Sequence, residues 1–158
     1  MSTQTTTYRM WQALAPRPFG SRLFSAAAMA RVPYFASVLP HIEQMEPGLA
    51  RVAVPKWFFV YNHLHTVHAI AACNAAEVAM GMLMEATVPT SHRWIPKAMS
   101  VQYLAKATTS LQATARLDPP DFARITEGTD VVVPVSVTDR RGLEVVHADI
   151  TTWVTPAR

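Results

Sequence analysis

Cysteine is almost absent from this chain, and charged residues are scarce. The 158 residues include one cysteine, Cys73, and only 16% of them are charged. A single cysteine excludes a disulfide within the chain, and its apolar surroundings predict a buried, small side chain. Half of the residues are hydrophobic, which argues against disorder. So little charge indicates that a partner or a lipid-like ligand covers part of the surface.

Long uninterrupted apolar runs are also missing. The two most apolar windows, 23–39 and 67–84, are interrupted by Arg31 and Glu77 respectively. A membrane-spanning helix needs about 20 apolar residues that are almost free of charge, so neither window predicts one. No basic segment precedes an apolar one at the N-terminus, and the net charge of +3 is scattered. We therefore expect a cytoplasmic protein that binds no nucleic acid.

The first part of the chain predicts a helix and a hairpin. A short helix is expected over 21–30, with Ser21 as its N-cap. Strands are expected over 39–45 and 49–54, on either side of a Pro-Gly turn. We divide the chain at this point into an N-terminal extension, 1–38, and a main domain, 39–158.

The rest of the chain predicts one long helix and then strands. Residues 67–84 are apolar on nearly every side, which is typical of a helix buried all round. Alternating patterns then predict four strands, over 98–104, 111–117, 131–137 and 143–154. The expected fold class is α+β, with an antiparallel sheet of about five to six strands wrapped around a central helix.

Polar residues gather where the long helix begins. Asn62 comes six residues before His68, and Glu77 comes nine residues after it. In this spacing and element order, residues 40–155 resemble the hotdog-fold acyl-CoA thioesterases, in particular the branch related to phenylacetate-pathway thioesterases. The run Arg-Trp-Ile-Pro-Lys at 93–97 also resembles a subgroup of uncharacterised hotdog proteins.

The resemblance implies a hotdog fold and the hydrolysis of acyl-CoA thioesters to free acid and coenzyme A. Glu77 would be the general base for water or the nucleophile. The backbone N–H of Ala69 would bind the developing oxyanion at the helix N-terminus. Asn62 would position the water or the carboxylate, and His68 would fix the loop or polarise the carbonyl. No cofactor is implied beyond coenzyme A as part of the substrate.

Helical geometry constrains how these groups meet. Nine helical residues advance about 13.5 Å and rotate by a net half turn, so Glu77 points away from the His68 face. Two paired central helices in a two-fold dimer could bring Glu77 of one chain to Asn62 and His68 of the other, as the resemblance implies. We therefore expect a homodimer, or a tetramer built as a dimer of dimers, that acts on acyl-CoA or an acyl-carrier thioester.

The chain departs from the family pattern at several positions. Ala69-Ile70 stands where relatives often have Gly-Gly, His65 where they often have Gly, and Gly81 where some have Thr. Pro96 occupies the place of a serine in others, so the helper hydroxyl is either missing or moved to Ser91 or Ser100. The substrate-binding candidates are His65, Thr66, Gly81, Arg93 and Lys97, the last two together with Lys106 as contacts to coenzyme A phosphates.

Alternatives remain beside this interpretation. The first is a non-catalytic hotdog protein that binds acyl-CoA or a fatty acyl chain, and the second is an interaction domain without a ligand. The spacing of His63, His65 and His68 allows a zinc hypothesis, but these residues lie in a loop without a clear carboxylate partner, so we expect no metal site. The methionines at 80–84 are core residues or the lining of an acyl pocket.

Overall fold

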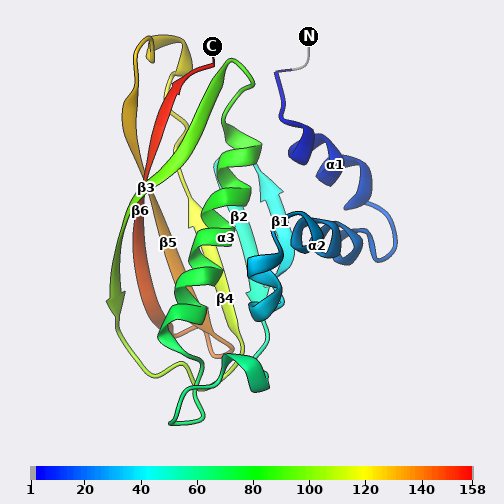
Figure 1. Ribbon diagram of the computed structural model, residues 1–158, viewed down its shortest axis with the longest axis vertical. Coiled ribbons are helices and arrows are strands. Elements are labelled where there is room, and N and C mark those ends of the chain that lie inside the picture. Colours follow the sequence, from blue (N-terminus) through cyan, green and yellow to red (C-terminus); the bar gives the residue numbers. More distant parts are fainter. Residues whose placement is uncertain (1–2, 158) are drawn as a thin grey trace.

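The computed structural model describes residues 3–157 as a sheet with one long helix across it (Figure 1). Six strands form the sheet in the order β1-β2-β4-β5-β6-β3, and all paired neighbours are antiparallel. The strands are β1 (His41–Glu46), β2 (Leu49–Val54), β3 (His92–Tyr103), β4 (Leu111–Arg116), β5 (Thr129–Asp139) and β6 (Glu144–Pro156). The central helix is α3 (Ala69–Thr87). The predicted α+β class, hairpin, helix and later strands are confirmed.

Small side chains let α3 lie close to the middle of the sheet. Ala75, Ala76 and Ala79 on α3 are fully buried, as are Ala113 and Ala115 on the inner face of β4. The helix makes its most extensive contacts with β4 and β2. Alanines on both surfaces keep the two backbones near each other, and valines of β5 and β6 fill the flanks of the core.

The N-terminal extension folds into helices that pack against the sheet edge and α3. They are α1 (Thr6–Leu14), α2 (Gly20–Arg31) and the 3₁₀ helix η1 (Pro33–Val38). Trp11 and Phe24 meet edge to face with their ring centroids 5.1 Å apart. The Ser25 hydroxyl accepts a hydrogen bond from the Ile42 N–H at 2.9 Å and so ties α2 to strand β1.

The predicted N-cap of α2 is wrong. The cap is Phe19, at a positive φ of 60°, and the Ser21 hydroxyl instead lies 3.1 Å from His41 Nε2. The helix begins one residue before Ser21, at Gly20. A Cβ at Gly20 would lie 1.7 Å from the Leu14 carbonyl oxygen, so only glycine fits where α1 and α2 meet.

Helix α3 is not buried all round, which corrects the prediction from its apolar composition. Ile70 is 52% exposed, and Cys73, Asn74 and Glu77 are half-buried on the same side of the helix. The predicted burial of Cys73 is therefore wrong. Its Sγ lies 3.4 Å from the Tyr103 hydroxyl, and this hydrogen bond, with burial, raises the pKa of Tyr103.

The same helix is the one segment within 3–157 that is long and apolar enough to cross a membrane. However, 61% of its most apolar stretch is buried inside the fold. Burial of this kind is typical of a core helix, and α3 lies against the sheet throughout its length (Figure 1).

Strand β3 forms one edge of the sheet and pairs only with β6. Met99, Val101 and Tyr103 stand opposite buried residues of β6, so they belong to the inner face of the sheet. Yet Met99 is 36% exposed and Tyr103 is 56% exposed. The inner face of β3 and the exposed side of α3 therefore form one uncovered surface in the single chain.

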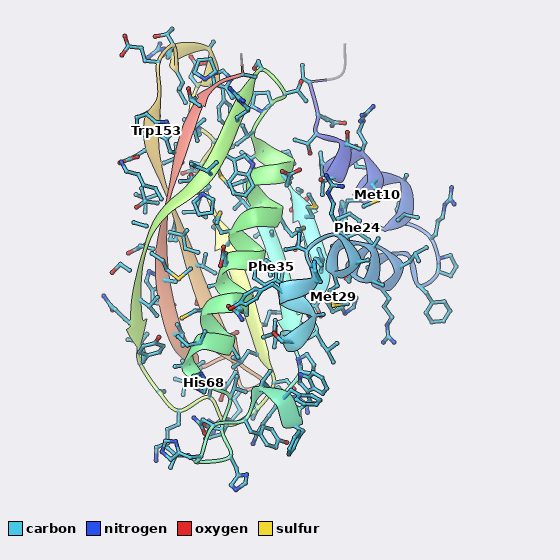
Figure 2. All side chains as sticks on the ribbon, viewed as in Figure 1. Met10, Phe24, Met29, Phe35, His68 and Trp153 are labelled. Atoms are coloured by element: carbon cyan, nitrogen blue, oxygen red, sulfur yellow. The ribbon has the colours of Figure 1, made fainter. Side chains whose placement is uncertain are left out.

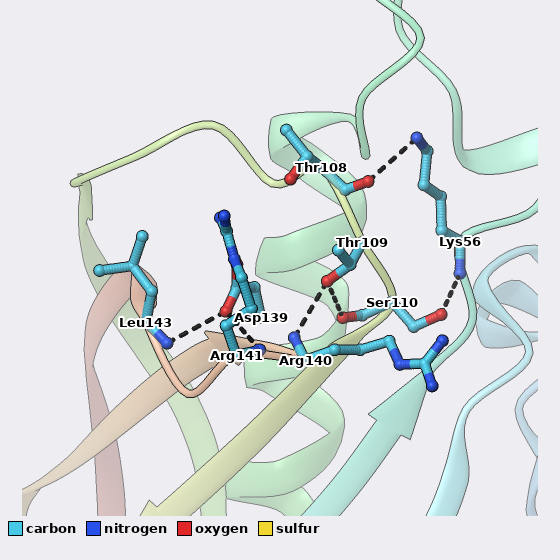
Figure 3. Close-up of polar contacts among 8 residues, drawn as sticks. All are labelled: Lys56, Thr108, Thr109, Ser110, Asp139, Arg140, Arg141 and Leu143. Atoms are coloured by element: carbon cyan, nitrogen blue, oxygen red, sulfur yellow. Dashed lines mark hydrogen bonds and ion pairs between the residues drawn. The ribbon is translucent and has the colours of Figure 1, made fainter.

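A hydrogen-bond network fixes the connections around the start of α3 (Figure 3). Asp139 Oδ1 accepts from the backbone N–H groups of Arg141 and Leu143 and so closes the β5–β6 turn. The Arg140 N–H donates to the Thr109 hydroxyl in the β3–β4 connection. Burial alone would raise the pKa of Asp139, but its hydrogen bonds with Arg141 and Leu143 outweigh burial and lower that pKa.

Candidate active site

Asn62 shapes the loop that leads into α3. Its Oδ1 accepts from the N–H groups of Leu64 and Thr66, at 2.9 and 3.1 Å. Its Nδ2 donates to the Thr66 hydroxyl at 2.8 Å. Asparagine is suited to this role because its short amide can replace backbone partners in a turn. All these partners lie inside the loop, so the structure gives Asn62 and Thr66 a role in holding the loop.

His68 caps the first turn of α3. Its backbone is extended, and its Nδ1 accepts a hydrogen bond from the Ile70 N–H at 3.1 Å. A neutral imidazole that accepts at Nδ1 carries its proton at Nε2. The His68 N–H donates to the Val60 carbonyl at 2.7 Å, which anchors the residue to the 3₁₀ helix η2 (Phe58–Val60). The exposed ring therefore has one free donor, at Nε2.

The N–H of Ala69 is available at the start of α3. As the first residue of the helix it has no carbonyl acceptor within the helix, and no hydrogen bond to this N–H is found within residues 3–157. The helix dipole adds partial positive charge here. A cavity of about 200 Å³ opens beside this terminus and is lined by Ser37, Val38, Phe59, Val60, Tyr61, His68, Ala71 and Asn74.

Glu77 lies in a second, larger cavity of about 280 Å³. The α3 side of this cavity consists of Glu77, Val78, Met80, Gly81, Met82 and Glu85. Most of the remaining wall is apolar and comes from α1, α2, η1, β1 and β3. A half-buried carboxylate thus lines a largely apolar cavity, an environment in which enzymes place general bases.

The two cavities share no lining residue. Asn62, His68 and Ala69 lie at the start of α3, whereas Glu77 lies nine residues further along it. One chain therefore does not bring the carboxylate to the loop and helix N-terminus, in keeping with the half-turn rotation between positions 68 and 77.

The remaining candidates are dispersed. Gly81 lines the larger cavity, where a Cβ would lie 3.7 Å from the Trp94 ring. His65 is exposed in the loop at a positive φ of 56°. Lys97 forms an ion pair with Asp130 at 2.8 Å, and neither Lys97 nor the exposed Arg93 lines either cavity.

The histidines do not gather into a metal site. Within residues 3–157, no group of three or more His, Cys, Asp or Glu side chains is placed to hold a metal ion. One ring nitrogen of His68 already accepts the Ile70 N–H.

The sequence analysis missed the residues that form the outer wall of the larger cavity. They include Met10 on α1, Met29 on α2, Phe35 on η1 and Trp94 on β3. Apolar residues at helical spacing in the N-terminal extension were the available signal, since a helix with one apolar side needs a surface to cover. The sequence alone does not say which surface that is.

Comparison with known proteins assigns the fold. A family model described as "Domain of unknown function (DUF4442)" matches residues 20–154. A crystal structure described as "genomics APC5556" is 41% identical, covers 96% of this chain and 98% of its own, and has a TM-score of 0.82. No curated protein is significantly similar in sequence.

Two further solved structures carry thioesterase names. A probable thioesterase from Pseudomonas aeruginosa is 19% identical, with 82% of this chain and 91% of its own covered and a TM-score of 0.75. A thioesterase family protein from Silicibacter pomeroyi is 16% identical, with 84% and 96% covered and a TM-score of 0.69. At these identities the likeness establishes a shared fold, and the hotdog fold expected from the sequence is confirmed.

Proposed function

We propose that this chain, which belongs to the DUF4442 family, hydrolyses acyl-CoA thioesters to free acid and coenzyme A in a site formed by two copies of the chain. The observation that carries the proposal is the arrangement along α3. Glu77 faces an apolar cavity, and an unpaired N–H and a histidine donor lie at the start of the same helix. The hotdog fold shared with proteins named thioesterases supports the reaction class.

The uncovered surface of the single chain supports a homodimer. It combines Ile70, Cys73 and Glu77 on α3 with Met99 and Tyr103 on β3. A two-fold axis passing near Cys73 would pair the two α3 helices antiparallel, because position 73 lies about midway between 68 and 77. Glu77 of one copy would then stand opposite His68 of the other. A dimer of dimers would keep the same pairing.

In this dimer each group has a chemical task. Glu77 takes a proton from a water molecule as the water oxygen forms a bond to the thioester carbonyl carbon. The partner chain's backbone N–H at position 69 stabilises the oxyanion, and the Nε2–H of its residue 68 donates to the same oxygen. The C–S bond then breaks, and the thiolate leaves and receives the proton from Glu77. In the alternative route, the Glu77 carboxylate itself attacks the thioester carbonyl carbon.

The other candidates serve substrate binding in the proposal. His65 and Thr66 belong to the loop that leads into the helix N-terminus, and Gly81 leaves space in the acyl cavity. Arg93 and Lys97, with Lys106 further along the chain, would contact the phosphates of coenzyme A, for which Lys97 has to leave its ion pair with Asp130. We propose a cytoplasmic location, where coenzyme A thioesters are found, and no separate cofactor.

Release of free thiol from a panel of acyl-CoAs tests the reaction. Replacing Glu77 by glutamine removes the base while keeping the shape, so we expect hydrolysis to fall at least about 100-fold. Glu85→Gln is the matched control, since Glu85 lines the same cavity two helical turns further along. Equal loss in both variants, or no loss in Glu77→Gln, would contradict the assigned base.

Mixed dimers test the shared site. Glu77→Gln and His68→Ala chains are inactive alone in this scheme, but a dimer of one of each retains one complete site. Refolding equal amounts together makes half of the dimers mixed, so activity should recover to about a quarter of the wild-type value. No recovery, with mixed dimers demonstrated by two different affinity tags, would contradict the shared site.

A non-catalytic acyl-CoA or fatty-acyl binding protein is the second candidate. The observation that favours it is that one chain supplies an apolar cavity, whereas it does not bring together the groups proposed for catalysis. If no acyl-CoA is turned over but one still raises the melting temperature, this second function replaces the first.

A further inference from the structure

The larger cavity has an unexpected second wall. One wall is α3, but the facing wall comes from the N-terminal extension, which contributes Met10 from α1, Ala28 and Met29 from α2, and Phe35 from η1. Figure 2 shows Phe35 lying between η1 and α3, with Met29 on the neighbouring helix. These segments lie outside the sheet and central helix that define the fold.

The cavity has the chemistry of a hydrocarbon site with one reactive end. Its polar lining is limited to Thr7, Arg31, Glu77 and Glu85, and methionine, alanine, proline and aromatic side chains make up most of the rest. Methionine suits an alkyl chain because its unbranched side chain adapts to the shape of a ligand. Glu77 and Glu85 mark two points along the helix wall.

The length of the cavity indicates the size of its occupant. Glu77 and Glu85 both line the cavity and are eight residues apart, or about 12 Å along the helix. An extended alkyl chain advances about 1.25 Å per carbon, so a chain that reaches from Glu77 to Glu85 has roughly eight to ten carbons.

The facing wall is fixed in place. The Thr5 hydroxyl donates to the Glu85 carbonyl oxygen at 2.7 Å, which ties the start of α1 to the end of α3. The buried hydrogen bond from Ile42 N–H to the Ser25 hydroxyl ties α2 to β1. Because both helices are attached to the core, the wall sets a definite limit on the length of a ligand.

We propose that the N-terminal extension is the specificity wall of an acyl pocket, and that Met10, Ala28, Met29 and Phe35 select an unbranched acyl chain of roughly eight to ten carbons. The cleavage of that acyl group rests on the proposed function, with the thioester at Glu77. The binding of the chain does not, because Met10, Ala28, Met29 and Phe35 line the pocket within one copy.

Binding of free fatty acids from butanoate to hexadecanoate tests the wall without using activity. Displacement of a fluorescent fatty-acid probe gives the affinity for each length. We expect octanoate and decanoate to bind best, and Ala28→Phe to weaken decanoate at least about tenfold and to shift the optimum to shorter acids. Met29→Ala should shift it to longer acids, and this variant adds no bulk to the fold.

Matched controls lie on the same helix. Ala26 and Leu23 are exposed on α2 and do not line the cavity, so Ala26→Phe and Leu23→Ala should leave the length profile unchanged. Ala28→Leu replaces Ala28→Phe if the larger ring lowers the melting temperature. Equal profiles for Ala28 and Ala26 variants and an unmoved optimum in Met29→Ala would overturn the proposal.

The two proposals fail in different ways. If the chain-length profile of binding shifts as expected but the protein cleaves no acyl-CoA, the proposed hydrolysis is contradicted and the proposed specificity wall is supported. If acyl-CoA cleavage depends on Glu77 but no substitution in the wall changes the chain-length preference, the proposed hydrolysis is supported and the specificity wall is contradicted.

Discussion

Gly20, the first residue of α2, and Gly81, inside α3, differ in whether an alanine would fit. The difference comes from the nearest atom that an added Cβ would meet. At Gly20 the nearest obstacle to a Cβ is a backbone oxygen at 1.7 Å, whereas at Gly81 it is the Trp94 ring at 3.7 Å, an ordinary contact. Helix propensity favours alanine over glycine by about 1 kcal/mol in a helix interior such as position 81. The space around the added Cβ therefore decides whether a change to alanine stabilises or destabilises the fold.

We therefore expect Gly81→Ala to raise the free energy of unfolding by about 0.5–1 kcal/mol. Gly20→Ala should lower it by more than about 3 kcal/mol, because the junction of α1 and α2 has to open. Denaturant unfolding of the two variants checks this pair. Similar changes for both would contradict the close approach at Gly20.

His147 makes stability depend on pH. Its Nδ1 lies 2.9 Å from Glu144 Oε1, and this hydrogen bond raises the pKa of His147 and lowers the pKa of Glu144. The contribution of His147 is complete below its ordinary pKa of 6.5 and is lost as pH rises through the higher folded value. That of Glu144 is present above 4.5 and is lost as pH falls through the lower folded value.

The pair should thus stabilise the fold most between pH 4.5 and 6.5. We expect the melting temperature of His147→Gln to fall below that of the wild type in this window and to approach it as pH rises above the raised pKa of His147 in the folded state. The difference should correspond to less than about 1 kcal/mol, because the His147 side chain is 34% exposed. Thermal melts across the pH range measure it, and a constant difference would contradict the pairing.

At the scale of elements, the loop before α3 depends on one side chain. The amide of Asn62 accepts two backbone N–H groups and donates to Thr66. Asn62→Ala should cost about 1–2 kcal/mol of unfolding free energy, and Asn62→Asp less, because it keeps the acceptor oxygen. Denaturant melts give the order of the two variants. The opposite order would indicate that the donor to Thr66 matters more than the turn.

The elements themselves show how far the sequence was informative. Alternation predicted β4 and β6 to within about two residues, because one face of each strand is buried and the other is not. Strand β3 was expected from residue 98 but begins at His92. The strand runs through Pro96, which an edge strand tolerates because one side of its backbone has no partner.

The positions of the candidate residues were predictable where local chemistry defines them. The spacing from Asn62 to His68 to Glu77 located a loop, a helix N-terminus and a carboxylate on different sides of one helix, and the structure places them so. The prediction that α3 is buried all round was wrong because it rested on composition alone. Cys73 and Ile70 are apolar, but composition does not indicate where the sheet ends and leaves that side of the helix uncovered.

At the scale of the whole molecule, the uncovered surface should determine assembly. We expect the protein to sediment as a dimer or a dimer of dimers, and Met99→Arg to lower the mass of the assembly by placing a charge on the apolar inner face of β3. Leu23→Arg is the control, since Leu23 is exposed on α2, which packs against β1 at the opposite edge of the sheet from β3. Analytical ultracentrifugation decides it, and a Met99→Arg variant that keeps the wild-type mass would contradict this interface.

The edge of the sheet also divides into a protected half and an open half. Pro96 lacks an N–H, a register shift follows it, and Lys97 adds a charge, all of which hinder the addition of another strand along 92–97. Residues 98–103 have no such protection. A chain held as a monomer, by dilution or by an interface substitution, therefore presents this stretch as a template for indiscriminate strand pairing. Once dissociated, the Met99→Arg variant should therefore aggregate on standing more readily than the wild-type assembly.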